Sequence, residues 1–293
     1  MECAGLSDEP MHLKRMTVTP GLFAALLLLL FVPAGQADVS APTEIERGFQ
    51  SMYNLQFDQA HQDFAIWEQL HPDDPLGPVS QAAGYLFAEF ARLNILESEL
   101  FTNDKNFEAR SKLSPDPQVR ARFDGALSRG DQLAGVVLQQ HPDDSNALFA
   151  KILALGLRSD YVALIDKEDF AALHYMKQGR ILAQQLLKQK PDQYDALLAV
   201  GVENYLTGIK PAPVRWMLSL GGIDPDKEQG IRELQQTAAH GNLLKPFAKL
   251  LLAVAALRDK NNAEGCNLLN ELATDYPRNP LYRNSAPECR GAH

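Results

Sequence analysis

The side chains best suited to acid–base or metal chemistry in this chain are its histidines and cysteines, and their spacing supports neither chemistry. No two histidines have the His-x-x-x-His or His-x-x-Glu-His spacing through which one helix face holds a zinc ion. Neither Cys266 nor Cys289 has a neighbour at metal-ligand spacing. We therefore expect no catalytic residue, no metal and no cofactor. The seven histidines are expected to be solvated or to cap helices: His12, His61, His71, His141, His174, His240 and His293.

A run of acids before a predicted helix has the outline of a calcium-binding loop but lacks its essential residues. Asp224, Asp226 and Glu228 alternate as they would in such a loop. Gln229 stands where the loop needs a glycine, and Gln235 stands where it needs a bidentate acid. Helix capping, with Asp224 as the N-cap, accounts for these acids better. The chain also contains no Gly-rich phosphate loop and no Gly-x-Ser-x-Gly elbow.

An aromatic and basic group surrounds a proline-rich insert at residues 209–224. Tyr205 precedes the insert, and Arg215 and Trp216 lie within it. An arginine in an apolar stretch must find a carboxylate or carbonyl groups if it is buried, and Glu203 is a candidate partner. Two interpretations are open. Arg215 holds the insert against the rest of the protein, which we favour, or it recognises the carboxylate of a ligand.

The first 37 residues have the three parts of a signal peptide. Lys14 and Arg15 precede an uninterrupted apolar run at residues 21–32, and small residues follow up to Ala37. About a dozen apolar residues are fewer than the roughly 20 that a spanning helix needs. We predict cleavage after Ala37 and export of the protein to the periplasm or the extracellular space. An uncleaved N-terminal anchor is the alternative.

Removal of the signal peptide leaves Cys266 and Cys289 as the only cysteines. An even count of cysteines in an oxidising compartment predicts a disulfide between them. Two unpaired thiols are the alternative. The disulfide would tie the C-terminal tail to the last helical hairpin.

The chain is acidic, with 28 basic and 37 acidic side chains and a formal net charge of −9. This excess of acids argues against nucleic acid and against anionic headgroups as partners, because both require a cationic surface. We also expect no stable membrane span once the signal peptide is removed.

The elements that would position any site are helices, and four of them end at a proline with the same pattern before it. The residue twelve positions before the proline is small, and the residues eight and five positions before it are mostly apolar. Offsets of four and three place these residues on one helix face, so each helix offers a notch followed by core contacts. The prolines are Pro72, Pro142, Pro191 and Pro277. The small residues are Ala60, Gly130, Gly179 and Gly265, followed by Phe64, Ala134, Ala183 and Leu269, and then by Trp67, Val137, Leu186 and Leu272.

No segment shows the alternation of an exposed strand, so the predicted fold is all-α. A capping box at Thr43 and Glu46 opens the first helix, and Asp116 is expected to cap a helix that starts at Pro117. We expect one domain of stacked helical hairpins from residue 38 to 293. A loop insert at 101–117, the insert at 209–224 and a tail at 277–293 interrupt the pattern.

These helices resemble the tetratricopeptide repeat (TPR), a helical hairpin of about 34 residues. Ala60, Phe64, Trp67 and Pro72 follow the pattern of its second helix, and Gly201 falls at a small position of its first helix. The proline spacings of 70, 49 and 86 residues depart from that period, so the array is degenerate. The likeness, which covers most of the mature chain, is to exported bacterial helical-repeat proteins with no assigned reaction. It implies an α–α superhelix, a TPR-like solenoid.

In such repeats the first helices line a concave groove that binds peptides. The resemblance therefore implies that Phe49, Met52 and Tyr53 face a ligand, although core packing is the favoured alternative for Phe49. We expect a non-catalytic scaffold that binds a protein or an extended peptide in the periplasm or cell envelope. The alternative is a small-molecule binder or an envelope enzyme that uses a cleft near residues 101–117 and Arg215.

Overall fold

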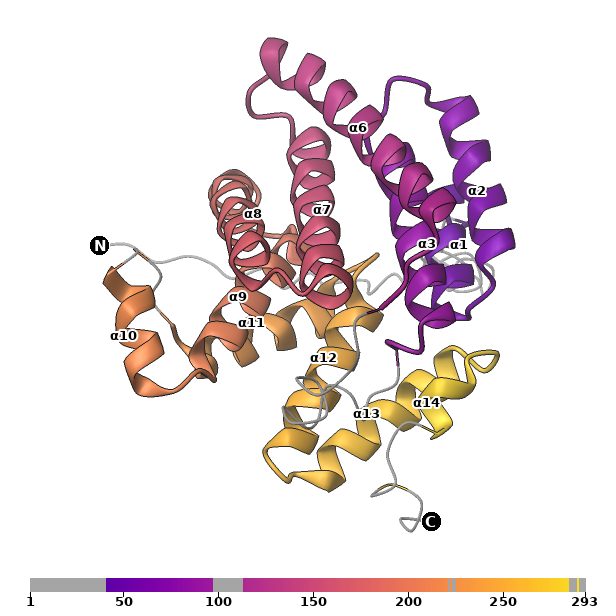
Figure 1. The fold of residues 1–293 in the computed structure, drawn as a ribbon. Coiled ribbons are helices and arrows are strands. Elements are labelled where there is room, and N and C mark those ends of the chain that lie inside the picture. Colours follow the sequence, from indigo (N-terminus) through magenta and orange to yellow (C-terminus); the bar gives the residue numbers. More distant parts are fainter. Residues whose placement is uncertain (1–40, 97–112, 221, 223–224, 285–288, 290–293) are drawn as a thin grey trace, which may run out of the picture. The chain divides into compact units, whose positions relative to one another are not determined.

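Helices make up the regular structure of the residues that the computed structural model describes, which are 41–96, 113–220, 222, 225–284 and 289 (Figure 1). The all-α prediction is confirmed for these residues. The predicted signal peptide and residues 101–112 of the first insert lie outside them. The helices are α1 (Glu44–Tyr53), α2 (Phe57–Leu70), α3 (Leu76–Arg92), α6 (Pro117–Gln140), α7 (Ser145–Tyr161), α8 (Asp169–Gln189), α9 (Leu197–Gly208), α10 (Ala212–Leu220), α11 (Lys227–His240), α12 (Lys245–Arg258), α13 (Asn262–Asp275) and α14 (Pro280–Asn284), with a π-helical turn η1 at Val162–Asp166 and a 3-10 turn η2 at Tyr194–Ala196.

The helices of the unit Pro42–His293 pack as sequential pairs. The pairs are α1 with α2, α3 with α6, α7 with α8, α9 with α11, and α12 with α13. The second helix of each pair also packs on the first helix of the next pair. A continuous hydrophobic core runs through these pairs from Ile45 in α1 to Leu252 in α12. The prediction of sequentially packed helical hairpins is therefore confirmed.

The four prolines that close helices sit in nearly identical turns. The residue before each proline is the C-cap, and it leaves helical backbone because the proline ring disfavours the α conformation there. The N–H two residues after each proline donates to the carbonyl of that C-cap residue at 3.0 to 3.1 Å. The C-cap φ angles are −133° at His71, −132° at His141, −130° at Lys190 and −126° at Tyr276. The repeated sequence pattern thus reports a repeated local structure.

The small residues of these helices are buried, as the notch pattern requires. Ala60 is fully buried, and Gly130, Gly179 and Gly265 are buried as well. A Cβ added at Gly130 would overlap Val79 of α3, so the absence of a side chain is needed for that close approach. At Gly179 the nearest atom to an added Cβ is Leu155 Cβ at 3.7 Å, which is an ordinary contact. The notch is therefore sterically required in α6 but not in α8.

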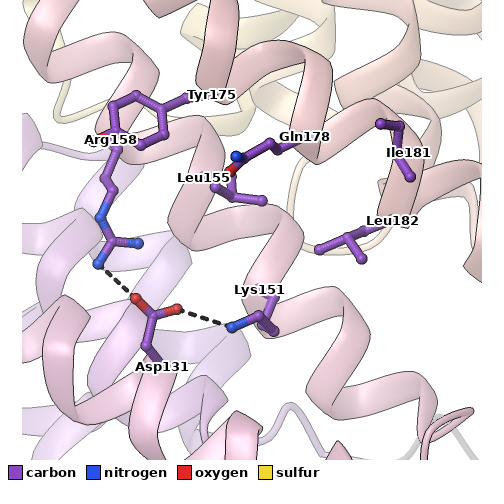
Figure 2. A pocket seen from close by; sticks show the side chains of 8 residues that line it. All are labelled: Asp131, Lys151, Leu155, Arg158, Tyr175, Gln178, Ile181 and Leu182. Carbon is purple, nitrogen blue, oxygen red and sulfur yellow. Dashed lines mark hydrogen bonds and ion pairs between the residues drawn. The ribbon is translucent and has the colours of Figure 1, made fainter. Parts of the chain in front are cut away.

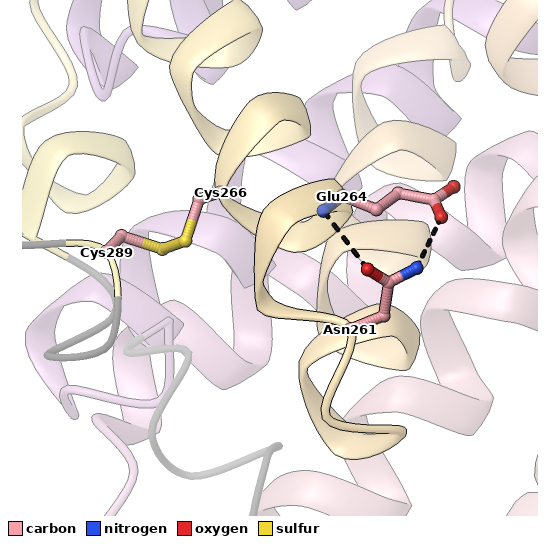
Figure 3. Close-up of a disulfide and its surroundings, with 4 residues drawn as sticks. All are labelled: Asn261, Glu264, Cys266 and Cys289. Carbon is pink, nitrogen blue, oxygen red and sulfur yellow. Dashed lines mark hydrogen bonds between the residues drawn. A yellow bond between two sulfur atoms is a disulfide. The ribbon is translucent and has the colours of Figure 1, made fainter. Parts of the chain in front are cut away.

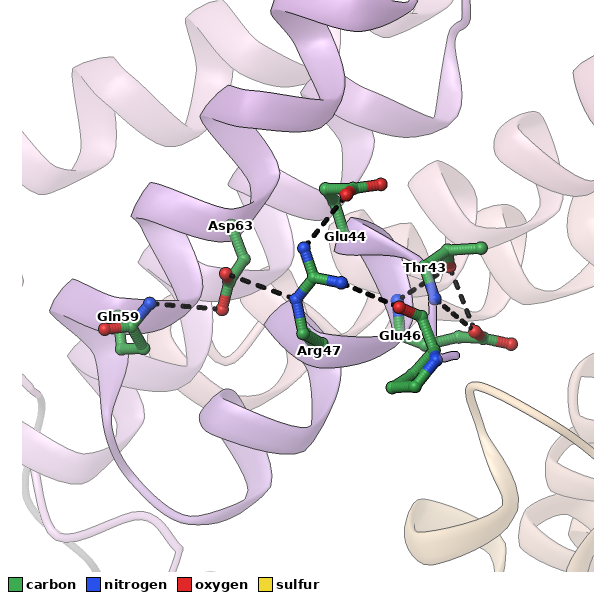
Figure 4. Close-up of polar contacts among 7 residues, drawn as sticks. Thr43, Glu44, Glu46, Arg47, Gln59 and Asp63 are labelled. Atoms are coloured by element: carbon green, nitrogen blue, oxygen red, sulfur yellow. Dashed lines mark hydrogen bonds and ion pairs between the residues drawn. The ribbon is translucent and has the colours of Figure 1, made fainter. Parts of the chain in front are cut away.

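The first helix begins at the predicted capping box. Glu46 N–H donates to Thr43 Oγ1 at 3.3 Å, and Thr43 N–H donates to Glu46 Oε2 at 2.7 Å. Next to it, Arg47 pairs with Glu44 at 2.9 Å and lies 3.8 Å from Asp63 of α2 (Figure 4). These contacts fix the start of α1 and connect it to its partner helix. The Asp116 cap of α6 is also confirmed, because its side chain accepts from the N–H groups of residues 118 and 119.

The first hairpin contacts the α11–α12 connection and the turn after α13, although 190 to 226 residues separate the bonded partners. Tyr53 Oη donates to the Leu243 carbonyl at 2.9 Å, and Asn279 Nδ2 donates to the Tyr53 carbonyl at 2.9 Å. Asn242 Nδ2 donates to Glu46 Oε1 at 2.7 Å. We call these contacts, together with the α11–α12 connection at residues 241–244, the seam. It covers Tyr53, at the end of α1, with residues of the chain itself.

Part of the predicted insert at 209–224 is a helix. Residues Ala212–Leu220 form α10, which packs on α9, and none of its residues is buried. Pro211 immediately precedes this helix, and its carbonyl accepts the N–H groups of Val214 and Arg215 at 2.9 and 3.0 Å. The cap of the next helix also differs from the prediction. Asp226, not Asp224, accepts the N–H of Gln229 at the start of α11.

Candidate functional site

The aromatic residues of α1 that were expected to face a ligand are buried. The exposed fractions are 3% for Phe49, 2% for Met52 and 6% for Tyr53. Phe49 packs edge-on against Phe64 with ring centres 5.6 Å apart, which is the core packing weighed as its alternative role. Burial raises the pKa of Tyr53, whose hydroxyl is bonded within the seam. In this structure a ligand has no access to these side chains.

The second predicted group divides between core and surface. Tyr205 is buried, whereas Trp216 is 66% exposed on α10. Glu203 is not the partner of Arg215. It pairs instead with Arg180 at 3.5 Å, and burial raises its pKa while Arg180 opposes that shift. Arg215 donates to the Gly208 carbonyl at 3.5 Å, a long hydrogen bond that links α10 to the end of α9.

A disulfide joins Cys266 to Cys289, as predicted (Figure 3). Cys266 lies in the first turns of α13 and is buried, and the two Cα atoms are 5.5 Å apart. The bond fixes a C-terminal residue 23 positions away onto the last hairpin. It is consistent with an oxidising compartment.

Among the described residues, α6, α7 and α8 form an open groove. It has a volume of about 480 Å³, within the range of roughly 300 to 1,000 Å³ seen for ligand sites. Figure 2 shows Asp131 of α6 between Lys151 and Arg158 of α7. Arg158 lies 2.6 Å from Asp131 and Lys151 lies 3.4 Å from it. The residues that line this groove are Asp131, Lys151, Leu155, Arg158, Tyr175, Gln178, Ile181 and Leu182.

Helical periodicity explains why these residues meet. Lys151, Leu155 and Arg158 are four and three positions apart, so they share one face of α7. Tyr175, Gln178 and Leu182 share one face of α8 by the same spacing. The two faces give the groove an aliphatic floor and a polar rim. Ile181 is 56% exposed, so apolar surface is accessible there.

The sequence analysis did not identify this groove, because none of its residues has a type that signals chemistry. One signal was present. Lys151 and Arg158 are the two basic residues of segment 145–161, whose stretch between residues 147 and 157 is otherwise apolar, and they fall on the same side of α7. A polar stripe on an apolar helix predicts a solvent-facing side, but it does not show which neighbouring helix stands across it.

A second hollow lies on α12 and α13 and is lined by polar and charged residues. Lys249 bridges Glu271 at 2.9 Å and Asp275 at 3.5 Å. The remaining lining residues are Asn267, Asn270 and Thr274. Arg215 and Trp216 line neither of the two hollows. No apolar residue lines this hollow, whereas three line the α6–α8 groove, which is therefore the better candidate.

Within the described residues, no group of three or more His, Cys, Asp or Glu side chains is placed to hold a metal ion. Asp224 of the acidic run lies outside the described residues. Among the helices that are described, none combines the length and the apolar character that crossing a bilayer requires.

Comparison of the chain with protein-family models, with curated proteins and with solved structures finds no match. The class that the fold itself defines is an all-α protein built from sequential helical hairpins, stabilised by a disulfide near its C-terminus.

Proposed function

We propose that this protein is a non-catalytic helical-repeat scaffold of the TPR-like type, exported to the periplasm or cell envelope, that binds a protein or an extended peptide in the α6–α8 groove. The groove is the observation that carries the proposal. Its aliphatic floor at Leu155, Ile181 and Leu182 can bury apolar side chains, and its rim has charged groups for orientation. The four matching proline turns support the repeat character.

The charges of the groove indicate the kind of peptide that fits. Lys151 and Arg158 share one carboxylate, Asp131, so the three side chains carry a net positive charge. Their side chains are 23 to 33% exposed, which leaves them accessible to a ligand. A peptide with an acidic residue next to apolar residues would complement both features. The disulfide supports an oxidising location.

Peptides selected from a random library against the full chain test this proposal. Titration of the selected peptides against Ile181→Glu should show binding weakened by about tenfold or more, because the charge disrupts the apolar floor. Val136→Glu is the matched control, since Val136 is 53% exposed on α6 and does not line the groove. Equal affinities of the two variants for the peptides, or a selection that yields none, would contradict the proposal.

A further inference from the structure

The helix α10 exposes an unusual amount of apolar surface. The exposed fractions are 71% for Leu220, 66% for Trp216, 63% for Met217 and 37% for Val214. Soluble proteins seldom expose large contiguous apolar patches unless they bind something there. α10 stands beside α9 at the edge of the ribbon in Figure 1. This surface is separate from the α6–α8 groove, so an occupant of α10 need not be the ligand of the groove.

The polar groups of α10 are confined to one stripe. Arg215 and Ser219 are four positions apart and therefore lie on the same side of the helix. Ser219 Oγ also donates to the Arg215 carbonyl at 3.0 Å, which satisfies its hydroxyl within the helix. The rest of the circumference is apolar. Such a helix presents a convex apolar surface with a cationic edge.

The segment that contains α10 is locally cationic, although acidic residues flank it at Glu203 and from Asp224 onward. Residues 204–223 contain Lys210 and Arg215 but no Asp or Glu. The formal net charge of −9 disfavours anionic headgroups for the chain as a whole. Charges beyond about 8 to 10 Å are largely screened at physiological ionic strength, however, so the local charge decides the interaction of a protruding element.

We propose that α10 docks on the surface of a membrane that contains anionic lipids, with Trp216, Met217 and Leu220 inserted at the boundary between headgroups and acyl chains. Tryptophan is favoured at that boundary, and Lys210 and Arg215 attract the anionic headgroups. A lipid surface accommodates a convex apolar helix without a preformed cavity. A protein partner would need a complementary groove for it.

The test uses the fluorescence of Trp216 in the full chain. Spectra of the wild type and of Trp216→Phe are recorded with vesicles that contain equal amounts of phosphatidylglycerol and phosphatidylcholine, and with vesicles of phosphatidylcholine alone. Both sets carry brominated acyl chains, which quench tryptophan at short range. The difference between the two proteins isolates Trp216 from Trp67, the other tryptophan. Attachment through another segment does not by itself place Trp216 among the acyl chains.

We expect bromolipid quenching of Trp216 with the anionic vesicles and weaker quenching without phosphatidylglycerol. Lys210→Gln and Arg215→Gln should each weaken the partition of the protein onto the anionic vesicles about fivefold, which is the effect of one cation near an anionic surface. Val136→Glu, at an exposed apolar residue of α6 that lines neither hollow, should leave this partition unchanged. Thermal melts followed by circular dichroism confirm that each variant folds.

Three results would overturn the proposal. One is a Trp216 signal that vesicles do not change. Another is equal quenching by both kinds of vesicle, which would remove the role of the cations. The third is a lipid-free dimer, seen by sedimentation equilibrium and abolished by Leu220→Glu, which would assign α10 to a second copy of this chain.

Discussion

The helices α1 and α10 both carry aromatic residues that the sequence analysis raised as candidate binding residues, yet their environments are opposite. Tyr53 of α1 is 6% exposed and Trp216 of α10 is 66% exposed. The difference arises from partners that are remote in sequence. Tyr53 is covered by the α11–α12 connection and by the turn after α13, whereas α10 packs lightly on α9 and has no buried residue. Aromatic type therefore does not distinguish a core position from a binding surface in this chain.

The largest expected effect on stability comes from substituting the buried aromatic residue, and the exposed one provides the direct comparison. Tyr53→Ala should lower the free energy of unfolding by about 4 kcal/mol, because it leaves a cavity in the core and removes the bond to Leu243. Trp216→Ala should change it by less than about 0.5 kcal/mol, as is usual for an exposed residue. Urea unfolding measures both. Similar losses from the two substitutions would contradict the contrast between α1 and α10.

The disulfide tests how firmly the C-terminal residues are held on the last hairpin. Cys289→Ser should lower the free energy of unfolding by about 3 kcal/mol under non-reducing conditions, because the unfolded chain regains the freedom of the opened loop. Reductant should lower the free energy of unfolding of the wild type by a similar amount and leave that of the variant unchanged. Mass spectrometry after alkylation provides the control. Two alkylated thiols in the wild type without reductant would refute the disulfide.

Asp195 tests the seam itself, because it holds the α11–α12 connection in place. Its carboxylate accepts the N–H groups of Asn242, Leu243 and Leu244 at 2.9, 2.9 and 3.1 Å. Asp195→Asn replaces one acceptor oxygen with a donor and should cost about 2 kcal/mol of unfolding free energy. Asp192→Asn, at an exposed residue three positions earlier, should have no measurable effect in the same urea titration. If Asp195→Asn left the free energy of unfolding unchanged, the seam would contribute little to stability.

Asp160, at the end of α7, is partly exposed and so lies between the buried Tyr53 and the exposed Trp216. Burial raises its pKa to about 7. The folded state then binds a proton between about pH 4 and pH 7 that the unfolded state has lost, so stability falls as pH rises through this window. Because part of Asp160 is exposed, Asp160→Asn should stabilise the protein by only about 1 to 2 kcal/mol near pH 8 and hardly at all near pH 4. Thermal unfolding across this pH range checks the sign, and an equal effect at both ends would contradict the raised pKa.

Much of the helical framework could be predicted from the sequence, because local rules determine it. The prolines at 72, 142, 191 and 277 exclude the next helical hydrogen bond, and the capping box at Thr43 is a local hydrogen-bond pattern. The candidate site could not be predicted in this way. The burial of Tyr53 depends on Leu243 and Asn279, and the groove depends on how α6 and α8 stand across α7. Such long-range packing leaves no fixed spacing in the sequence.

Hydrogen exchange at single-residue resolution tests the contrast between the closed seam and the exposed α10 most directly. The N–H groups of Leu243 and Leu244 are bonded to Asp195 inside the seam. They should exchange only through large-scale unfolding, whereas the amides of α10 should exchange at least about a hundredfold faster through local opening. Equal protection of α10 and the seam, or rapid exchange at Leu243 and Leu244, would contradict this account.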